Sequence, residues 1–333
     1  MLMDTVTLAR QLIDIPSISG EEQQILEVLE QHCTCMGMAV EREYIEKNRW
    51  NLYAGWTEYP QVLFTTHVDT VPPFSPSRVE EDRLYGRGSC DTKGIIAAML
   101  SACCHIREQG AKPALLFVVG EETDSIGAKT AASGGRRAQY IVNGEPTENM
   151  LASAHKGVLS YTLQTTGQAA HSAYPERGHS AIHTLLNILH DIINAEWGEN
   201  HEFGASTLNI GIISGGNALN TFAPSASATV MHRLVDDAEL RKQQVERLVG
   251  REAEIQFHSV TQPQRLHTVQ GFETVIVNYG TDIPYLQSLG TCLMLGPGSI
   301  HQAHSDNEYV GISELHKAVD LYIELFERLY EAA

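Results

Sequence analysis

Three short, almost uninterrupted apolar runs constrain the fold of this chain more than any other feature. They are QVLFTTHVD (61–69), ALLFVVGEE (114–122) and AQYIVNGE (138–145), and each ends in polar residues. Apolar runs of this length are typical of central strands that are buried on both faces of a sheet. Residues 91–110 between the first two runs have the small and aliphatic pattern of a helix that stops at a glycine. This order predicts an α/β fold, with a parallel-rich mixed sheet flanked by helices.

The pattern changes after residue 155, which indicates a second domain. Residues 158–166, 207–214, 225–235 and 253–260 alternate between apolar and polar positions, as half-buried strands do, and helical patterns cover 180–194 and 237–249. From residue 266 the sequence pattern resembles that of the first part of the chain again, and it ends in an amphipathic helix at 311–330. A chain of 333 residues also exceeds the usual size of one core. We therefore predict an inserted α+β domain, residues 156–264, within a larger domain formed by residues 1–155 and 265–333.

The charge balance argues against two classes of partner. The chain has 23 Lys and Arg against 41 Asp and Glu, a formal net charge of −18. Such a surface repels nucleic acid phosphates and anionic lipid headgroups, so we expect neither a nucleic acid nor a membrane partner. The first residues lack the apolar stretch of a signal peptide, which predicts a cytoplasmic protein.

Histidine and acidic side chains stand where the predicted strands end. His67, Asp69, Glu121, Glu122 and Glu145 all fall at carboxyl ends of strands, which is where open α/β sheets bind ligands. Nitrogen and carboxylate ligands of this kind suit two divalent cations that share one bridging carboxylate. The spacing of His67 and Asp69 puts both side chains on one face of a strand, so Asp69 can orient the imidazole.

Each of these residues also has a plainer interpretation. His67 could be a hydrogen-bonded structural histidine. Asp91 precedes a predicted helix, so it could be a simple N-cap rather than a bridging ligand. Glu121 and Glu122 could be a surface pair, although burying two carboxylates behind an apolar run is costly without a cation. If the pair does lie in a metal site, one glutamate could bind metal while the other faces the attacking water.

Six motifs together resemble one family of hydrolases. They are HVDT, GRGSCDTKG, VGEE, NGEPT, AAHSAYPERG and GPGSIHQAHSDNEYV. This set is similar to the dinuclear zinc deacylase and carboxypeptidase family, which contains acetylornithine deacetylase, succinyl-diaminopimelate desuccinylase and aminoacylase. GRGSCDTKG and GPGSIxxAH resemble acetylornithine deacetylase and its relatives acting on acetyl-lysine or acetyl-citrulline most closely.

The resemblance implies a ligand set for two divalent cations, with zinc expected and cobalt or manganese as alternatives. His67 and Glu145 would hold one ion, Glu122 and His304 the other, and Asp91 would bridge them. Glu121 would be the general base, and Asp69 would support the catalytic site through His67. The Asp91–Thr92 peptide bond is expected to be cis.

The resemblance further implies that the inserted domain is a lid that forms a homodimer. His171 would stabilise the developing oxyanion, and Asn220, Arg233 and the glycine loop at Gly298 would contact the substrate. Taken without the resemblance, His171 could be a loop histidine without a role, Arg233 a surface residue and Gly298 part of a turn.

The expected reaction is metal-dependent hydrolysis of the amide bond of a small N-acyl amino acid. A dipeptidase or carboxypeptidase with the same metals is the alternative within the enzyme class. A non-catalytic metal- or amino-acid-binding relative is the alternative outside it, and would be expected to have a broken ligand set.

Overall fold

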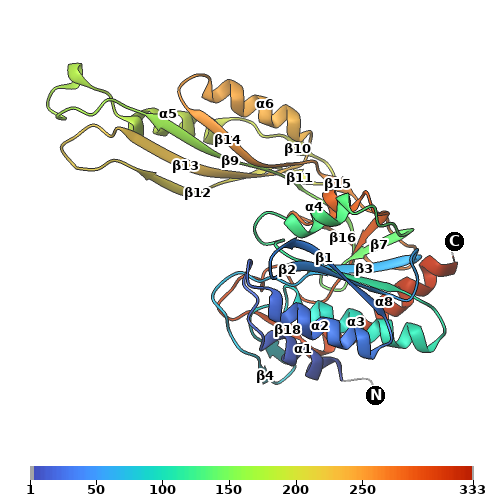
Figure 1. The fold of residues 1–333 in the computed structure, drawn as a ribbon. Coiled ribbons are helices and arrows are strands. Elements are labelled where there is room, and N and C mark those ends of the chain that lie inside the picture. Colours follow the sequence, from blue (N-terminus) through green and yellow to red (C-terminus); the bar gives the residue numbers. More distant parts are fainter. Residues whose placement is uncertain (1–3, 332–333) are drawn as a thin grey trace. The chain divides into compact units, whose positions relative to one another are not determined.

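The computed structural model describes residues 4–331, which divide into two compact units (Figure 1). The first unit contains the chain up to Ser153, Leu266–Val275 and the chain from Thr281 onward. The second contains Ala154–Arg265 and Ile276–Gly280. The sequence patterns assign this last segment to the larger domain. It belongs to the second unit because Gly280 lies against Val158 and Arg233, so closely that a Cβ would meet Val158 at 2.7 Å.

The first unit is built around a six-stranded mixed sheet with the order β1-β2-β6-β3-β7-β17. Strand β3 pairs in parallel with β6 and β7, and β7 with β17, whereas β2 pairs antiparallel with β1 and β6. Every residue of β3 and β6 is buried, as their apolar runs predict. The expected α/β fold is therefore confirmed. The strands are β1 (Ala39–Glu46), β2 (Arg49–Gly55), β3 (Val62–His67), β6 (Ala114–Val118), β7 (Tyr140–Asn143) and β17 (Thr291–Met294).

Helices cover both faces of this sheet. Helices α1, α2, α3 and α8 lie on one face and α4 on the other (Figure 1). In α8 the buried residues recur at helical spacing and form the stripe that packs on the core. Helix α3 is buried over almost its whole length because it consists mainly of small and aliphatic residues. The helices are α1 (Thr5–Ile13), α2 (Gln23–Cys35), α3 (Lys93–Glu108), α4 (Ile126–Ser133), α7 (Ile283–Leu286) and α8 (Ile312–Glu331).

The parallel strands determine where a site can form. Because β3, β6, β7 and β17 run in the same direction, their carboxyl ends lie at one edge of the sheet. The chain leaves these strands at His67, Val118, Asn143 and Met294. The segments that follow therefore start from one edge although they are far apart in the sequence.

The second unit is a four-stranded antiparallel sheet with the order β12-β13-β9-β14, covered by two helices. Its core forms between the inner side chains of β9 and β13 and the buried faces of the helices. All six elements were expected from the alternating and helical patterns. They are β9 (Gly157–Thr166), α5 (Ala181–Asn194), β12 (Thr207–Gly215), β13 (Ser225–Leu234), α6 (Ala238–Val249) and β14 (Glu254–Thr261).

Short elements complete the chain. One three-stranded sheet has the order β18-β5-β4, and it joins β4 (Arg78–Glu80), β5 (Arg83–Tyr85) and β18 (Tyr309–Gly311). Another has the order β15-β8-β16, and a two-stranded ribbon joins β10 to β11. These are β8 (Leu151–His155), η1 (Pro175–Arg177), β10 (Glu199–Asn200), β11 (Gly204–Ala205), β15 (Gln264–Arg265) and β16 (Thr274–Val277). None of the helices in residues 4–331 combines the length and apolar composition needed to cross a bilayer.

Candidate metal centre

Three of the expected ligands meet at the carboxyl edge of the sheet. Donor atoms of His67, Asp91 and Glu122 all lie within 4.8 Å of one another. His67 ends β3, Asp91 precedes α3, and Glu122 lies in the turn after β6. His67 Nε2 donates to Asp91 Oδ1 over 3.0 Å, and both side chains are buried.

His304 joins this cluster from the loop after β17. Its Nε2 lies 3.0 Å from Glu122 Oε1 and 3.4 Å from Asp91 Oδ2. The two oxygens of Asp91 therefore face two different histidines. Helix α3 begins only at Lys93, with Thr92 as its N-cap, so the interpretation of Asp91 as an N-cap is wrong. The expected cis peptide bond between Asp91 and Thr92 is present.

Glu121 and Glu145 belong to the same electrostatic cluster. Burial raises the pKa of both carboxyl groups well above the usual value. The charge of Glu145 raises the pKa of Glu121 further. Asp91 and Glu122 also raise the pKa of Glu145. Asn143 Nδ2 donates to Glu145 Oε1 over 3.3 Å. Acidic groups that follow β6 and β7 and that precede α3 therefore lie in one electrostatic cluster.

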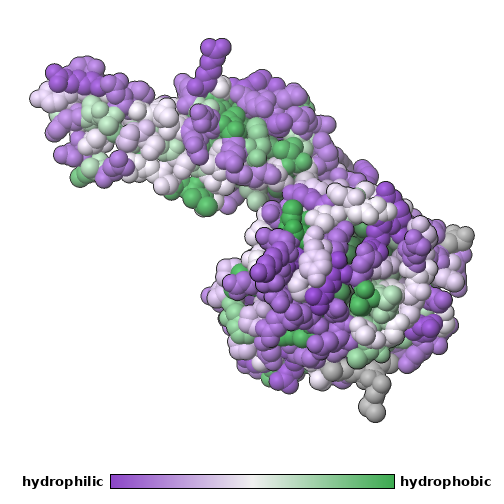
Figure 2. All heavy atoms as spheres, in the orientation of Figure 1, coloured by the Kyte–Doolittle hydropathy of each residue, from purple (hydrophilic) through white to green (hydrophobic). Residues whose placement is uncertain are grey.

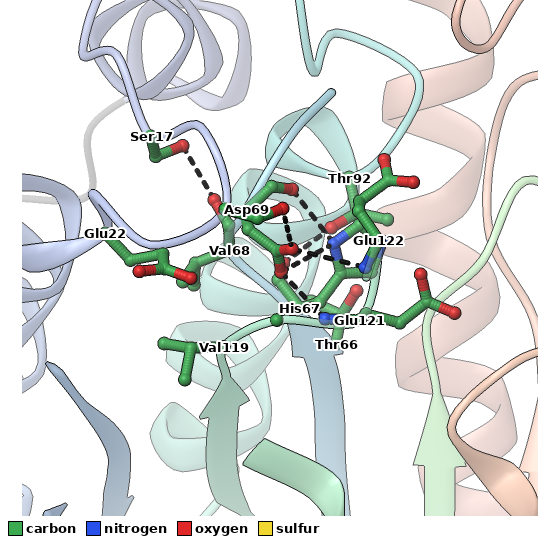
Figure 3. A network of polar contacts seen from close by, with 12 residues as sticks. Ser17, Glu22, Thr66, His67, Val68, Asp69, Thr92, Val119, Glu121 and Glu122 are labelled. Carbon is green, nitrogen blue, oxygen red and sulfur yellow. Dashed lines mark hydrogen bonds and ion pairs between the residues drawn. The ribbon is translucent and has the colours of Figure 1, made fainter. Parts of the chain in front are cut away.

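Asp69 holds the backbone of the two neighbouring glutamates (Figure 3). Its carboxylate accepts the backbone N–H of Glu121 at 3.1 Å, that of Glu122 at 3.2 Å and the Ser19 hydroxyl at 2.7 Å. Figure 3 shows that the two glutamate side chains point in different directions from this support. The expected contact with the His67 imidazole is long, at 3.5 Å, and the shorter hydrogen bond of 3.0 Å goes to the Asp69 carbonyl.

The two histidines supply the positive charge of the cluster. Burial acts to lower the pKa of His67, but its hydrogen bonds with Asp69 and Asp91 outweigh that effect and raise the pKa well above its usual value. Hydrogen bonds to Asp91 and Glu122 raise the pKa of His304 to about 10. Burial would raise the pKa of Asp91, yet His304 and His67 hold it well below its usual range.

The donor set fits divalent cations. Imidazole nitrogen and carboxylate oxygen are zinc ligands, and a site for two ions requires a carboxylate that can face both. Asp91 lies between the two histidines in this way. The raised pKa values of Glu121 and Glu145 reflect carboxylates crowded at low dielectric, which is the condition that a bound cation relieves.

The glycine loop after β17 packs closely against Cys90, the residue before Asp91. Gly298 has φ +79°, and a Cβ there would meet Cys90 Sγ at 2.6 Å, so glycine is required. Its carbonyl accepts the N–H of Glu148 at 2.8 Å. The remaining expected residues belong to the second unit: His171 and Asn220 are exposed in loops, and Arg233 is half-buried on β13. His171 Nδ1 accepts the N–H of Ala173 at 3.2 Å.

Two acidic residues of the first unit were not expected from the sequence. Asp282, at the N-terminus of α7, is buried, and burial raises its pKa to about 6. Its charge raises the pKa of both Glu121 and Glu145. Glu308 is buried against the backbone of Asp91. In the sequence Asp282 resembles a helix cap and Glu308 a residue before a strand, so no local signal marks either residue.

Comparison with known proteins places these observations in a family. The family model described as peptidase family M20/M25/M40 matches residues 63–328. A peptidase M20 domain-containing protein of Schizosaccharomyces pombe is 38% identical over 330 residues, covering 95% of this chain and 82% of the relative. A probable carboxypeptidase of Aspergillus terreus is 36% identical, covering 96% and 84%.

The fold of this chain is similar to that of a solved structure over nearly its whole length. The crystal structure of a tripeptidase from Staphylococcus aureus superposes with a TM-score of 0.85 at 21% identity, covering 99% of each chain. At this identity the likeness concerns the fold. The family assignment comes from the match to the family model and from the similarity in sequence to the relatives. This chain therefore belongs to the peptidase family M20/M25/M40.

Proposed function

We propose that this protein is a metal-dependent hydrolase that cleaves one amide bond in a small substrate. The observation that carries the proposal is the cluster of His67, Asp91 and Glu122, joined by His304, with Asp91 between the two histidines. Glu145 would complete the set, with His67 and Glu145 on one ion and Glu122 and His304 on the other. Zinc is the expected metal, and cobalt or manganese are alternatives.

When bound, two such cations would polarise the substrate carbonyl and make a water molecule more acidic. Glu121 accepts the proton of the attacking water and returns it to the departing amine. Its partly buried position and acidic neighbours favour this exchange, because they keep its affinity for a proton higher than that of an exposed glutamate. Asp69 accepts from the backbone amides of both Glu121 and Glu122, and so fixes the backbone from which the proposed base, Glu121, and the proposed metal ligand, Glu122, extend.

Residues of the second unit are proposed to bind the substrate. The His171 imidazole would stabilise the oxyanion, and the guanidinium of Arg233 suits bidentate binding of a carboxylate. Asn220, whose carbonyl accepts the N–H of Ser172 at 3.0 Å, would contribute its side-chain amide. Gly298 would place backbone groups beside the substrate in the first unit.

Two substrate classes share the required chemistry, an amide carbonyl next to an amino acid with a free carboxylate. The motifs GRGSCDTKG and GPGSIHQAH favour an N-acyl amino acid such as acetylornithine, acetyl-citrulline or acetyl-lysine. The similarity to a probable carboxypeptidase and to a tripeptidase favours a short peptide. We keep the N-acyl amino acid as the first candidate and the peptide as the second.

A single panel separates these candidates. The metal-free protein is loaded with zinc or cobalt, and the release of acetate from the three acetyl amino acids is compared with the cleavage of dipeptides and tripeptides. Cleavage of peptides alone would reject the deacetylase assignment. No turnover of any substrate by protein that holds two ions would favour a non-catalytic binding protein.

We also propose a homodimer formed through the second unit. Helix α5 exposes Leu186 and Ile193, two turns apart on one face, and the neighbouring edge strand β12 exposes Ile212 and Ile213. Figure 2 shows apolar surface along the edge where Figure 1 places β12. An unpaired strand edge with apolar side chains favours pairing with a second copy. Sedimentation should give a dimer that Ile193→Glu dissociates, and a monomeric wild type would reject the proposal.

A further inference from the structure

A buried ion pair lies directly behind the proposed bridging ligand. Arg87 Nη1 donates to Glu308 Oε2 over 2.6 Å, and the side chains are 4% and 2% exposed. The other carboxylate oxygen, Glu308 Oε1, accepts the backbone N–H of Cys90 at 3.0 Å and that of Asp91 at 3.1 Å. The Glu308 carboxylate therefore accepts hydrogen bonds from the backbone N–H groups of two consecutive residues, Cys90 and Asp91.

Glu308 is itself held by a sheet. Its carbonyl accepts the N–H of Gly86 at 3.1 Å, and the next residue, Tyr309, begins β18 and pairs with Tyr85 of β5. Arg87 is fixed as well, because its Nε donates to the Pro73 carbonyl over 3.2 Å. The carboxylate thus connects a fixed sheet to the backbone of the Asp91 segment.

The same loop carries His304, four residues before Glu308. His304 approaches Asp91 from the side-chain end, at 3.4 Å from Oδ2, while Glu308 binds Asp91 at its backbone. A shift of this loop would therefore move His304 and the Asp91 carboxylate together.

We propose that Glu308 is a positioning residue that fixes the Asp91 carboxylate between its two histidines and couples it to the His304 loop. The inference rests on the proposed metal centre, in which Asp91 faces both ions. Two charged hydrogen bonds to consecutive amides fix the direction of a backbone more firmly than neutral ones. Groups that orient metal ligands in this way typically change metal affinity 10- to 100-fold when they are removed.

The test separates positioning from stability. In the double variant Arg87→Met/Glu308→Leu the whole pair becomes apolar, a change that often leaves stability intact, but the two amides lose their acceptor. Glu308→Gln keeps one acceptor oxygen for the amides. The matched control is Glu314→Gln. Glu314 Oε2 accepts the Gly311 N–H at 2.9 Å, which is also a hydrogen bond from a backbone amide to a glutamate carboxylate, at the far end of β18. Zinc affinity is measured by competition with a chromophoric chelator, and unfolding is followed without metal.

The double variant should bind zinc about 10- to 100-fold more weakly than the control, Glu308→Gln should fall between them, and unfolding without metal should be similar in all. Zinc affinity of the double variant equal to that of the control would overturn the proposal. If the double variant does not fold, Glu308→Gln decides, and control-like affinity there overturns it. A wild type that binds no zinc would instead reject the metal centre itself.

Discussion

Replacing Asp69 by asparagine tests how much its carboxylate supports the backbone of Glu121 and Glu122. The substitution keeps the size of the side chain but exchanges one carboxylate oxygen for an NH2 group. In the structure Asp69 Oδ1 accepts from the Glu121 amide and Oδ2 from the Glu122 amide. Whichever way the asparagine turns, one of these two N–H groups must face another donor. The Ser19 hydroxyl can rotate, so its bond to Oδ2 is not necessarily lost.

The expected loss of stability follows from the number of hydrogen bonds that Asp69→Asn removes. A hydrogen bond to a charged group contributes about 1.5–3 kcal/mol, and at least one such bond disappears in a fully buried position. Burial alone would raise the pKa of Asp69, but hydrogen bonds with His67, Ser19 and Glu122 lower it, so the side chain is ionised at neutral pH. We therefore expect Asp69→Asn to lower the free energy of unfolding by about 1.5–3 kcal/mol.

The assay is urea unfolding of the metal-free protein, paired with a zinc titration. Asp124→Asn is the control, because Asp124 accepts the Ile126 amide at 3.1 Å in the same turn but is exposed, and its replacement should change the unfolding free energy by less than about 0.5 kcal/mol. Zinc affinity should fall in Asp69→Asn and not in the control. Equal stability and equal zinc affinity in the two variants would refute the role assigned to Asp69.

Three further predictions concern the base, a ligand and a buried histidine. Glu121→Gln should keep its metal but lose about 10²- to 10⁴-fold in turnover, and near-normal turnover would contradict its role as base. Glu122→Ala should lower the metal content found by elemental analysis, and unchanged stoichiometry would show that Glu122 is not a ligand. Burial lowers the pKa of His232 to about 4, so below about pH 6.5 the unfolded chain takes up a proton that the folded chain does not. The free energy of unfolding should therefore fall by about 2 kcal/mol between about pH 7 and pH 5 through this residue, a slope that His232→Phe should reduce. Equal slopes in wild type and variant would contradict this.

The sequence patterns predict the central elements because burial dominates their composition. The fully buried runs of β3 and β6 and the apolar stripe of α8 have the periods that their environments demand. The β1-β2 hairpin has no such signal at its outer strand. β1, AVEREYIE, is an edge strand with no fully buried residue, so charged side chains occupy much of it.

The residues of the candidate site also divide into those that the sequence predicts and those that it does not. His67, Asp91 and Glu122 could be predicted because each follows or precedes an element whose direction the apolar pattern sets. Asp282 and Glu308 depend on contacts between distant segments, such as the approach of Glu308 to the Cys90 amide across 218 positions. Nothing local distinguishes such an acid from a helix cap or a strand flank.

The most direct test of the metal centre is anomalous diffraction from crystals of the zinc-loaded protein at the zinc edge. We predict two peaks, one beside His67 and Glu145 and one beside Glu122 and His304, with the Asp91 carboxylate between them. Zinc-loaded crystals with no peak at these residues, or with His304 turned away from any peak, would contradict the proposal on which the function rests.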